Sequence, residues 1–355
     1  MIQEHGGNIY GQSSGIIDFS ANINPLGMPA KVKKAVIESI EKSDIYPDPD
    51  CVRLRKCISS YEEVPCEKIV CGNGAADLIY RIVSALKPKE ALVTAPTFGE
   101  YRKALSEYGC KISEYLLYED NDFIVDSKIV SCITDRTDIL FLCNPNNPTG
   151  KLIPCEVMET IAERCIETGT ILVSDECFIG FTGKEDTRSL KKYFNANCIV
   201  LKAFTKLFAC AGLRAGYAVF GSSKLAEKVR STGQYWSVSI PAQVAGIAAF
   251  QCDGFTERTI EYICAERKFL EEELGKCGIR FFSSEANYIL IKSFAGLDDM
   301  LLNSGIMIRN CENYSGLSKG FYRIAVRTHS ENLSLIEAIK KLVYGGINNA
   351  TDILR

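Results

Sequence analysis

Short apolar runs alternate with segments of helical periodicity up to about residue 221. The runs are KIVCG (68–72), ALVTA (91–95), DILFLC (138–143), TILVS (170–174), CIVLKA (198–203) and GYAVFG (216–221). Between them the spacing of apolar residues predicts helices, among them 75–86, 98–108, 154–167 and 223–232. This alternation favours an α/β domain built on a largely parallel sheet, which holds its ligands at the strand ends.

The character of the sequence changes after about residue 235. Long helical patterns at 240–252 and 254–275 precede short predicted strands at 279–283, 287–292 and 321–326 and a final helix from 330. A chain of 355 residues also exceeds the usual size of one hydrophobic core. We therefore predict an N-terminal arm over 1–27, a large ligand-binding domain over 28–235 and a smaller α+β domain over 236–355.

Charge and composition exclude several classes of partner. The net charge is -3, and no block of like charges is present to follow a nucleic-acid backbone. No window is long and apolar enough for a membrane span, and the N-terminus has no secretory pattern, so we expect a cytoplasmic protein. The 16 cysteines are scattered without a CxxC pair, which predicts reduced thiols and no bound metal.

Lys206 and Asp175 are the strongest candidates for chemistry. Lys206 lies among apolar residues in LKAFTKLFACAGLRAGY (201–217), and such surroundings favour the neutral amine that condenses with an aldehyde. Asp175 follows a predicted buried strand in VSDECFIG, and a buried carboxylate needs a cation, for example a protonated pyridine nitrogen. The simpler alternatives are a lysine that extends to solvent and a helix-capping aspartate.

Three further segments could bind the same aromatic phosphate. In CGNGAADLIYRI (71–82) the backbone amides of Gly74, Ala75 and Ala76 would face an anion at a helix N-terminus. Phe98 in APTFGEY could stack on an aromatic ring, and Asn147 in NPNNPTG could donate to a phenolate oxygen. Taken singly, these segments would more often be a tight turn, a core aromatic residue and a loop.

In this order the motifs resemble the fold-type I pyridoxal-5'-phosphate enzymes of the aminotransferase superfamily. The resemblance implies that Lys206 carries the cofactor and that Asp175 contacts its ring nitrogen. It also implies that Asn147 lies near the phenolic oxygen. The cofactor phosphate would bind Arg214, Thr205 and the loop of Gly74, Ala75 and Ala76. Tyr46 would reach the phosphate held by a partner subunit, which implies a homodimer.

The ends of the chain resemble one branch of that superfamily, the threonine-phosphate decarboxylases of cobalamin biosynthesis. The motifs are HGGNI (5–9), DFSANINPLGMP (18–29), YPDPD (46–50), IRNCENYSGL (308–317) and FYRIAVRT (321–328). The resemblance implies that Arg323 and Arg309 clamp an amino acid phosphate, with further contacts from His5, Gly6, Asn22 and Asn147. The products would be CO2 and an aminopropanol phosphate.

Alternatives stay open at this point. Histidinol-phosphate aminotransferases share the cofactor motifs but usually have DEAY where this chain has DECF, and a glycine-threonine pair in place of Arg327 and Thr328. Phe178 and Arg327 therefore favour the decarboxylase, although phosphoserine remains a possible substrate because one methyl group discriminates weakly. Ala203 stands where relatives usually have serine or threonine, which predicts one missing hydrogen bond to the cofactor phosphate.

Overall fold

A seven-stranded sheet forms the centre of the larger part of the molecule. The computed structural model describes residues 5–11 and 15–352. The sheet has the order β2-β8-β7-β6-β5-β3-β4, and only β8 runs antiparallel to its neighbours. Its strands are β2 (Ile69–Gly72), β3 (Glu90–Ala95), β4 (Lys111–Leu116), β5 (Ile139–Cys143), β6 (Ile171–Asp175), β7 (Cys198–Lys202) and β8 (Gly216–Phe220).

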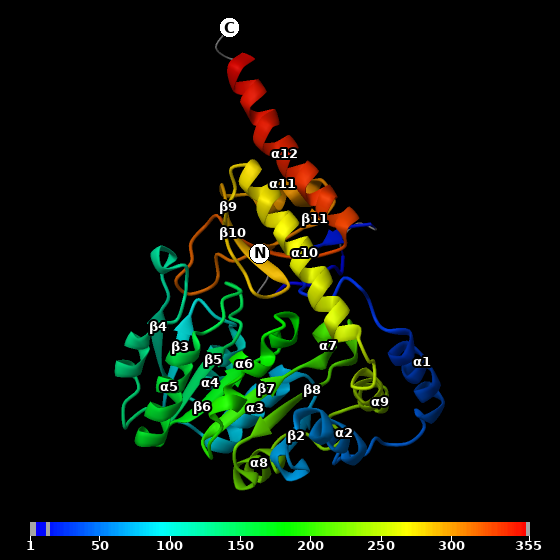
Figure 1. The fold of residues 1–355 in the computed structure, drawn as a ribbon, viewed down its shortest axis with the longest axis vertical. Coiled ribbons are helices and arrows are strands. Elements are labelled where there is room, and N and C mark those ends of the chain that lie inside the picture. Colours follow the sequence, from blue (N-terminus) through cyan, green and yellow to red (C-terminus); the bar gives the residue numbers. More distant parts are fainter. Residues whose placement is uncertain (1–4, 12–14, 353–355) are drawn as a thin grey trace.

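Helices cover both faces of this sheet (Figure 1). Along β5, Phe141 packs into one apolar cluster, whereas Leu140 and Leu142 pack into another on the opposite face. Strands buried on both faces read as continuous apolar runs, which is why the sequence predicted them. The main helices here are α1 (Ala30–Ser39), α2 (Val52–Glu62), α3 (Ala75–Leu86), α4 (Glu100–Glu107), α5 (Cys155–Thr168), α6 (Glu185–Arg188), α7 (Phe204–Leu207), α8 (Ser223–Arg230) and α9 (Ile240–Ala249).

A separate four-stranded antiparallel sheet forms the smaller part, with the order β12-β13-β10-β9. Its strands are β9 (Arg280–Phe282), β10 (Tyr288–Lys292), β12 (Arg309–Asn310) and β13 (Phe321–Ala325). Helices α10 (Phe255–Lys276), α11 (Leu297–Asn303) and α12 (His329–Asp352) accompany it (Figure 1). The predicted fold class, a large mostly parallel sheet with a smaller α+β part, is confirmed.

The chain start contacts both parts of the molecule. Strand β1 (Ile17–Asp18) pairs in parallel with β11 (Ile306–Met307). Asn24 then donates from Nδ2 to the carbonyl of Leu207 at 2.6 Å and to Thr259 at 2.8 Å. Residues 1–4 and 12–14 of the predicted arm lie outside the described residues, and the domain boundaries stay a prediction.

Two negative findings concern the described part of the chain. No helix there combines the length and the apolar character needed to cross a bilayer, and no cluster of histidine, cysteine and carboxylate side chains suits a metal ion. All 16 cysteines are free thiols.

Candidate functional site

The predicted site residues gather around one cavity of about 660 Å³. It lies where β5, β6 and β7 end, and its other walls come from the chain start and from β13. This is the edge at which a parallel sheet holds its ligands. The predicted residues that line it are His5, Gly6, Asn22, Gly74, Ala75, Ala76, Phe98, Asn147, Asp175, Thr205, Lys206, Arg214 and Arg323.

Lys206 enters the cavity from the short helix α7, which follows β7 directly. The side chain is half-buried, and its Nζ lies 5.9 Å from the centre of the Phe178 ring. Among the described residues, no carboxylate forms an ion pair with this amine. An amine that faces an aromatic ring and has no acidic partner is free to react with a bound carbonyl compound.

Asp175 is the last residue of β6 and is only 5% exposed. Its Oδ2 accepts the Tyr101 hydroxyl at 2.6 Å, and its Oδ1 accepts the Cys177 backbone N–H at 3.0 Å. Both donors are neutral, and no described cation pairs with the carboxylate. Because a buried charge without a counter-ion is costly, the arrangement suits a ligand that brings its own positive charge.

The loop before α3 forms a cradle that only glycine permits. Gly74 has a φ of +88°, and a Cβ added there would lie 2.6 Å from Nη2 of Arg214. The missing side chain therefore lets the guanidinium approach the N-terminus of α3. Thr205, 1% exposed, lines the same wall. Backbone amides, a guanidinium and a hydroxyl together make a site for a phosphate.

Arg323 presents the second cationic group. It is 5% exposed and donates from Nη1 to Asn147 Oδ1 at 2.5 Å and from Nη2 to the Ser20 carbonyl at 2.6 Å. Arg323 Nε and Asn22 Oδ1 are buried without a hydrogen-bond partner. Buried polar atoms are normally paired, so these two mark a place where a polar ligand completes the hydrogen bonding.

His5 lies at the cavity wall beside Phe98, with 5.6 Å between the two ring centres. Its Nε2 is 2.7 Å from Oε1 of Glu100, and the hydroxyl of Tyr80 donates to the other oxygen of Glu100 at 3.0 Å. The sequence did not single out Glu100, although it comes two positions after Phe98. It ties the chain start to α4.

Tyr46 and Arg309 do not line this cavity. Arg309 is the cross-strand partner of Arg323, but it lines a neighbouring cavity of about 490 Å³ and donates from Nη2 to Asn313 at 2.8 Å. Tyr46 is 75% exposed and stacks on Trp236, with ring centres 4.3 Å apart. Their predicted roles at the substrate and at a partner's cofactor stay predictions.

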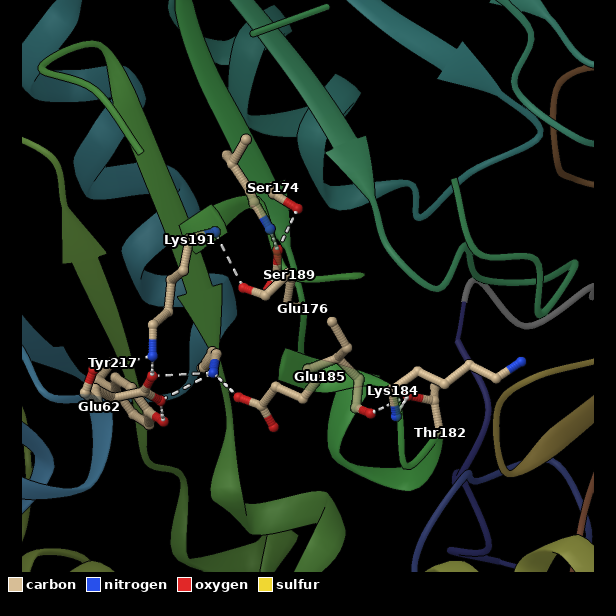
Figure 2. A network of polar contacts seen from close by, with 12 residues as sticks. Glu62, Ser174, Glu176, Thr182, Lys184, Glu185, Ser189, Lys191 and Tyr217 are labelled. Carbon is tan, nitrogen blue, oxygen red and sulfur yellow. Dashed lines mark hydrogen bonds and ion pairs between the residues drawn. The ribbon is translucent and has the colours of Figure 1, made fainter. Parts of the chain in front are cut away.

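A second charged cluster was not foreseen (Figure 2). It lies next to the cavity, since Lys202 directly precedes Ala203, which lines it. Lys202, the last residue of β7, is 4% exposed, lies 3.0 Å from Glu62 and pairs with Glu185. Glu62 also accepts Lys191 at 2.6 Å and the Tyr217 hydroxyl at 2.5 Å. Burial opposes the charged forms, yet the ion pairs hold the pKa of Glu62 below its usual value and that of Lys202 above it.

Glu176 belongs to this cluster and directly follows Asp175. It is 2% exposed and accepts hydrogen bonds from Ser174 and Ser189 (Figure 2). A third hydrogen bond comes from the Leu190 backbone N–H. Burial raises its pKa to about 7, although Lys202 and these donors act in the opposite direction.

The residues present in the cavity fit pyridoxal 5'-phosphate. The glycine cradle suits the phosphate, the uncompensated Asp175 suits a protonated ring nitrogen, and Lys206 suits the aldehyde. The donor set thus matches three separate functional groups of one molecule.

Comparison with known proteins agrees with this geometry. A family model, aminotransferase class I and II, matches residues 14–339. The threonine-phosphate decarboxylase of Salmonella typhimurium is 34% identical over 352 residues, which cover 96% of this chain and 97% of the relative. A histidinol-phosphate aminotransferase of Methanosphaera stadtmanae is 32% identical over 340 residues, which cover 92% of this chain and 90% of the relative.

Among solved structures, the histidinol-phosphate aminotransferase from Clostridium acetobutylicum has a TM-score of 0.85 and 31% identity. The match covers 92% of this chain and 99% of that one. The family match spans both sheets and every described element from β1 to α11. The chain therefore belongs to the aminotransferase class I and II family.

Proposed function

We propose that this chain is a pyridoxal-phosphate-dependent decarboxylase that converts L-threonine O-3-phosphate to CO2 and (R)-1-aminopropan-2-yl phosphate. The observation that carries the substrate class is the environment of Arg323. Its guanidinium is buried at the cavity wall, neutral acceptors hold it, and no described carboxylate compensates it. Such a group is suited to an anionic substrate. The similarity to the Salmonella typhimurium decarboxylase supports the choice of reaction.

When bound, pyridoxal phosphate supplies an electron sink for the bond that breaks at the substrate Cα. Lys206 would hold the cofactor through its aldehyde, and in its protonated form the same side chain would give a proton to the substrate Cα. Asp175 would pair with the ring nitrogen. Arg214, Thr205 and the Gly74 loop would hold the cofactor phosphate.

The residues that hold the substrate carboxylate select the reaction. Only a bond perpendicular to the cofactor plane overlaps with the electron sink, so its orientation decides which bond breaks. Arg323 is fixed from two sides, by Asn147 and by Ser20, and can therefore hold a carboxylate in one orientation. If Arg323 held the bond from Cα to the carboxylate in the perpendicular orientation, CO2 would be lost, whereas the other orientation would lead to amino transfer.

The same proposal includes a homodimer in the cytoplasm. Tyr46, Trp236 and Tyr235 form an exposed aromatic group in the single chain, in which Trp236 stacks on Tyr46 and meets Tyr235 edge-on. A second copy of the chain would bury them and bring Tyr46 to its cofactor phosphate. Free thiols throughout the chain suit a reducing compartment.

Product analysis with three substrates tests the proposed reaction. We expect CO2 from phosphothreonine, with slower release from phosphoserine. Amino transfer from histidinol phosphate to 2-oxoglutarate without any release of CO2 would overturn the proposal in favour of an aminotransferase, the second candidate, which the 32% identical Methanosphaera stadtmanae relative favours.

Borohydride treatment followed by peptide mapping tests the cofactor separately. The reduced cofactor should be attached to Lys206. A protein that takes up pyridoxal phosphate without labelling at this position would be a binding protein without the proposed chemistry.

A further inference from the structure

We propose that Tyr101 is a positioning residue that acts on the cofactor ring nitrogen through Asp175. The inference rests on pyridoxal phosphate as the cofactor and goes beyond the proposed reaction, because it concerns how the chain holds the Asp175 carboxylate in place. Tyr101 does not line the 660 Å³ cavity, and the sequence analysis did not predict a role for it.

Two aromatic contacts and one hydrogen bond fix the position of Tyr101. It lies in α4 and is 0% exposed. Its ring stacks on Phe141, with centres 5.1 Å apart and planes 12° from parallel, and meets the edge of Phe98 at 5.6 Å. The hydroxyl then lies 2.6 Å from Asp175 Oδ2. One buried ring therefore supports both the acid and the aromatic residue expected to stack on the cofactor.

The Tyr101 hydroxyl is the donor in this hydrogen bond, and Asp175 Oδ2 is the acceptor. Burial and the neighbouring Asp175 raise the pKa of Tyr101 well above its usual value, so the phenol keeps the proton that it donates. The other oxygen of Asp175 is held by the Cys177 N–H at 3.0 Å, so the plane of the carboxylate is fixed as well.

The other polar side chains near this carboxylate are the thiols of Cys143 and Cys177, and the Cys177 thiol also forms a hydrogen bond with Asp175. Cys143 is the cross-strand neighbour of Asp175, but its thiol donates to the Pro145 carbonyl at 3.4 Å. Burial raises the pKa values of both Cys143 and Cys177, so neither thiol supplies a charge. A thiol is a weak donor, so without the Tyr101 hydroxyl Asp175 would lose its strong side-chain donor among the described residues.

The test compares Tyr101→Phe with a matched control, Tyr115→Phe. The Tyr115 hydroxyl also donates to an aspartate, Asp126 Oδ1 at 2.6 Å, but neither residue lines the cavity. Each variant is titrated with pyridoxal phosphate and with its 1-deaza analogue, in which a CH group replaces the ring nitrogen. Both titrations are followed by absorbance, and the thermal midpoint of each cofactor-free protein is recorded.

We expect Tyr101→Phe to weaken binding of pyridoxal phosphate about tenfold and binding of the deaza analogue less than about twofold. Tyr115→Phe should change neither. Equal weakening for both cofactors would assign Tyr101 a structural role and overturn the inference, as would no weakening for either.

A second measurement keeps the inference testable if Tyr101→Phe proves unstable. Asp175→Asn alone should remove the preference for the cofactor with a ring nitrogen, and adding Tyr101→Phe to it should cause no further loss of affinity. A further loss would show that Tyr101 acts independently of Asp175. A wild-type chain that binds neither cofactor would refute the proposed function itself, which separates the two failures.

Discussion

Lys202 and Lys206 lie four positions apart in the same stretch of sequence, and the structure treats them in opposite ways. Lys202 is 4% exposed and has two carboxylate partners, Glu62 and Glu185. Lys206 is half-buried and faces an aromatic ring, with no acidic partner among the described residues. A lysine that forms ion pairs with carboxylates of the same chain has a structural role. A lysine that lines a cavity without such a partner is suited to binding a ligand.

The same contrast holds for the whole cavity and the whole cluster. In the cluster, one carboxylate, that of Glu62, pairs with Lys202 and accepts hydrogen bonds from Lys191 and Tyr217. In the cavity, Asp175 and Arg323 are held by neutral groups. A ligand with a protonated nitrogen and two acidic groups would restore there the balance that the cluster already has.

The largest expected effect comes from removing the compensated lysine. Lys202→Met leaves the buried Glu62 and the half-buried Glu185 beside an apolar side chain, and we expect the free energy of unfolding to fall by about 3–5 kcal/mol. Lys206→Met removes no ion pair and should change it by less than about 1 kcal/mol. Urea unfolding of both cofactor-free variants measures the difference. Equal destabilisation would contradict the division between the two regions.

Arg323→Lys tests the uncompensated side of the comparison. A lysine keeps the charge but loses the forked geometry, so kcat/KM for phosphothreonine should fall about 100-fold while the cofactor absorbance band remains. Arg136→Lys, at an exposed arginine remote from the cavity, serves as the control. A wild-type rate for Arg323→Lys would remove this residue from the substrate site.

How far the sequence predicted these two regions differs for a physical reason. Cavity residues sit at strand ends or beside glycine and proline, where local patterns are informative, so Asp175, Gly74 and Lys206 could be found. The cluster joins Glu62, Lys191 and Lys202 over long sequence separations. Nothing in the local pattern of each residue indicates its partner, and Lys202 was taken as part of an apolar run.

Other misses have similar causes. Strand β4 lies at the sheet edge and is only partly buried, so KISEYL has no apolar run to reveal it. Tyr101 falls on the buried side of a predicted helix and is indistinguishable from a core aromatic residue. Arg309 is paired with Arg323 as a strand neighbour, but its contact with Asn313 turns the guanidinium to another cavity, which no spacing rule anticipates.

Glu176 gives the cluster a dependence on pH. Its pKa of about 7 in the folded chain lies above the ordinary value of 4.5. Between these two pH values the folded protein therefore holds a proton on Glu176 that the unfolded chain releases. The resulting stabilisation is complete below pH 4.5 and is lost as the pH rises through 7. Glu176→Gln, which cannot ionise, should therefore exceed the wild type by about 1–3 kcal/mol at pH 8 and match it near pH 4.5.

Urea midpoints over this pH range check the prediction. Glu163→Gln, at an exposed position on α5, is the matched control and should follow the wild type at every pH. A constant offset between Glu176→Gln and the wild type would mean that Glu176 stays ionised in the folded chain.

Ala203→Ser has the smallest expected effect and probes the wall between the two regions. Ala203 is 6% exposed and lines both the cavity and a pocket of about 40 Å³ that includes Lys202. If its new hydroxyl reaches the cofactor phosphate, affinity for pyridoxal phosphate should rise about three- to tenfold, since one added hydrogen bond to a charged group contributes about 1 kcal/mol. Ala21→Ser, on another wall of the cavity, should leave the affinity unchanged.

The direction of the Ala203→Ser effect locates the boundary. If cofactor affinity rises and the urea midpoint of the cofactor-free protein is unchanged, the new hydroxyl points into the cavity, where the ligand is its partner. If the urea midpoint changes and affinity does not rise, the hydroxyl points toward the charged cluster around Lys202. In that case the alanine costs the cofactor no hydrogen bond, and its difference from the serine or threonine of relatives is neutral for phosphate binding.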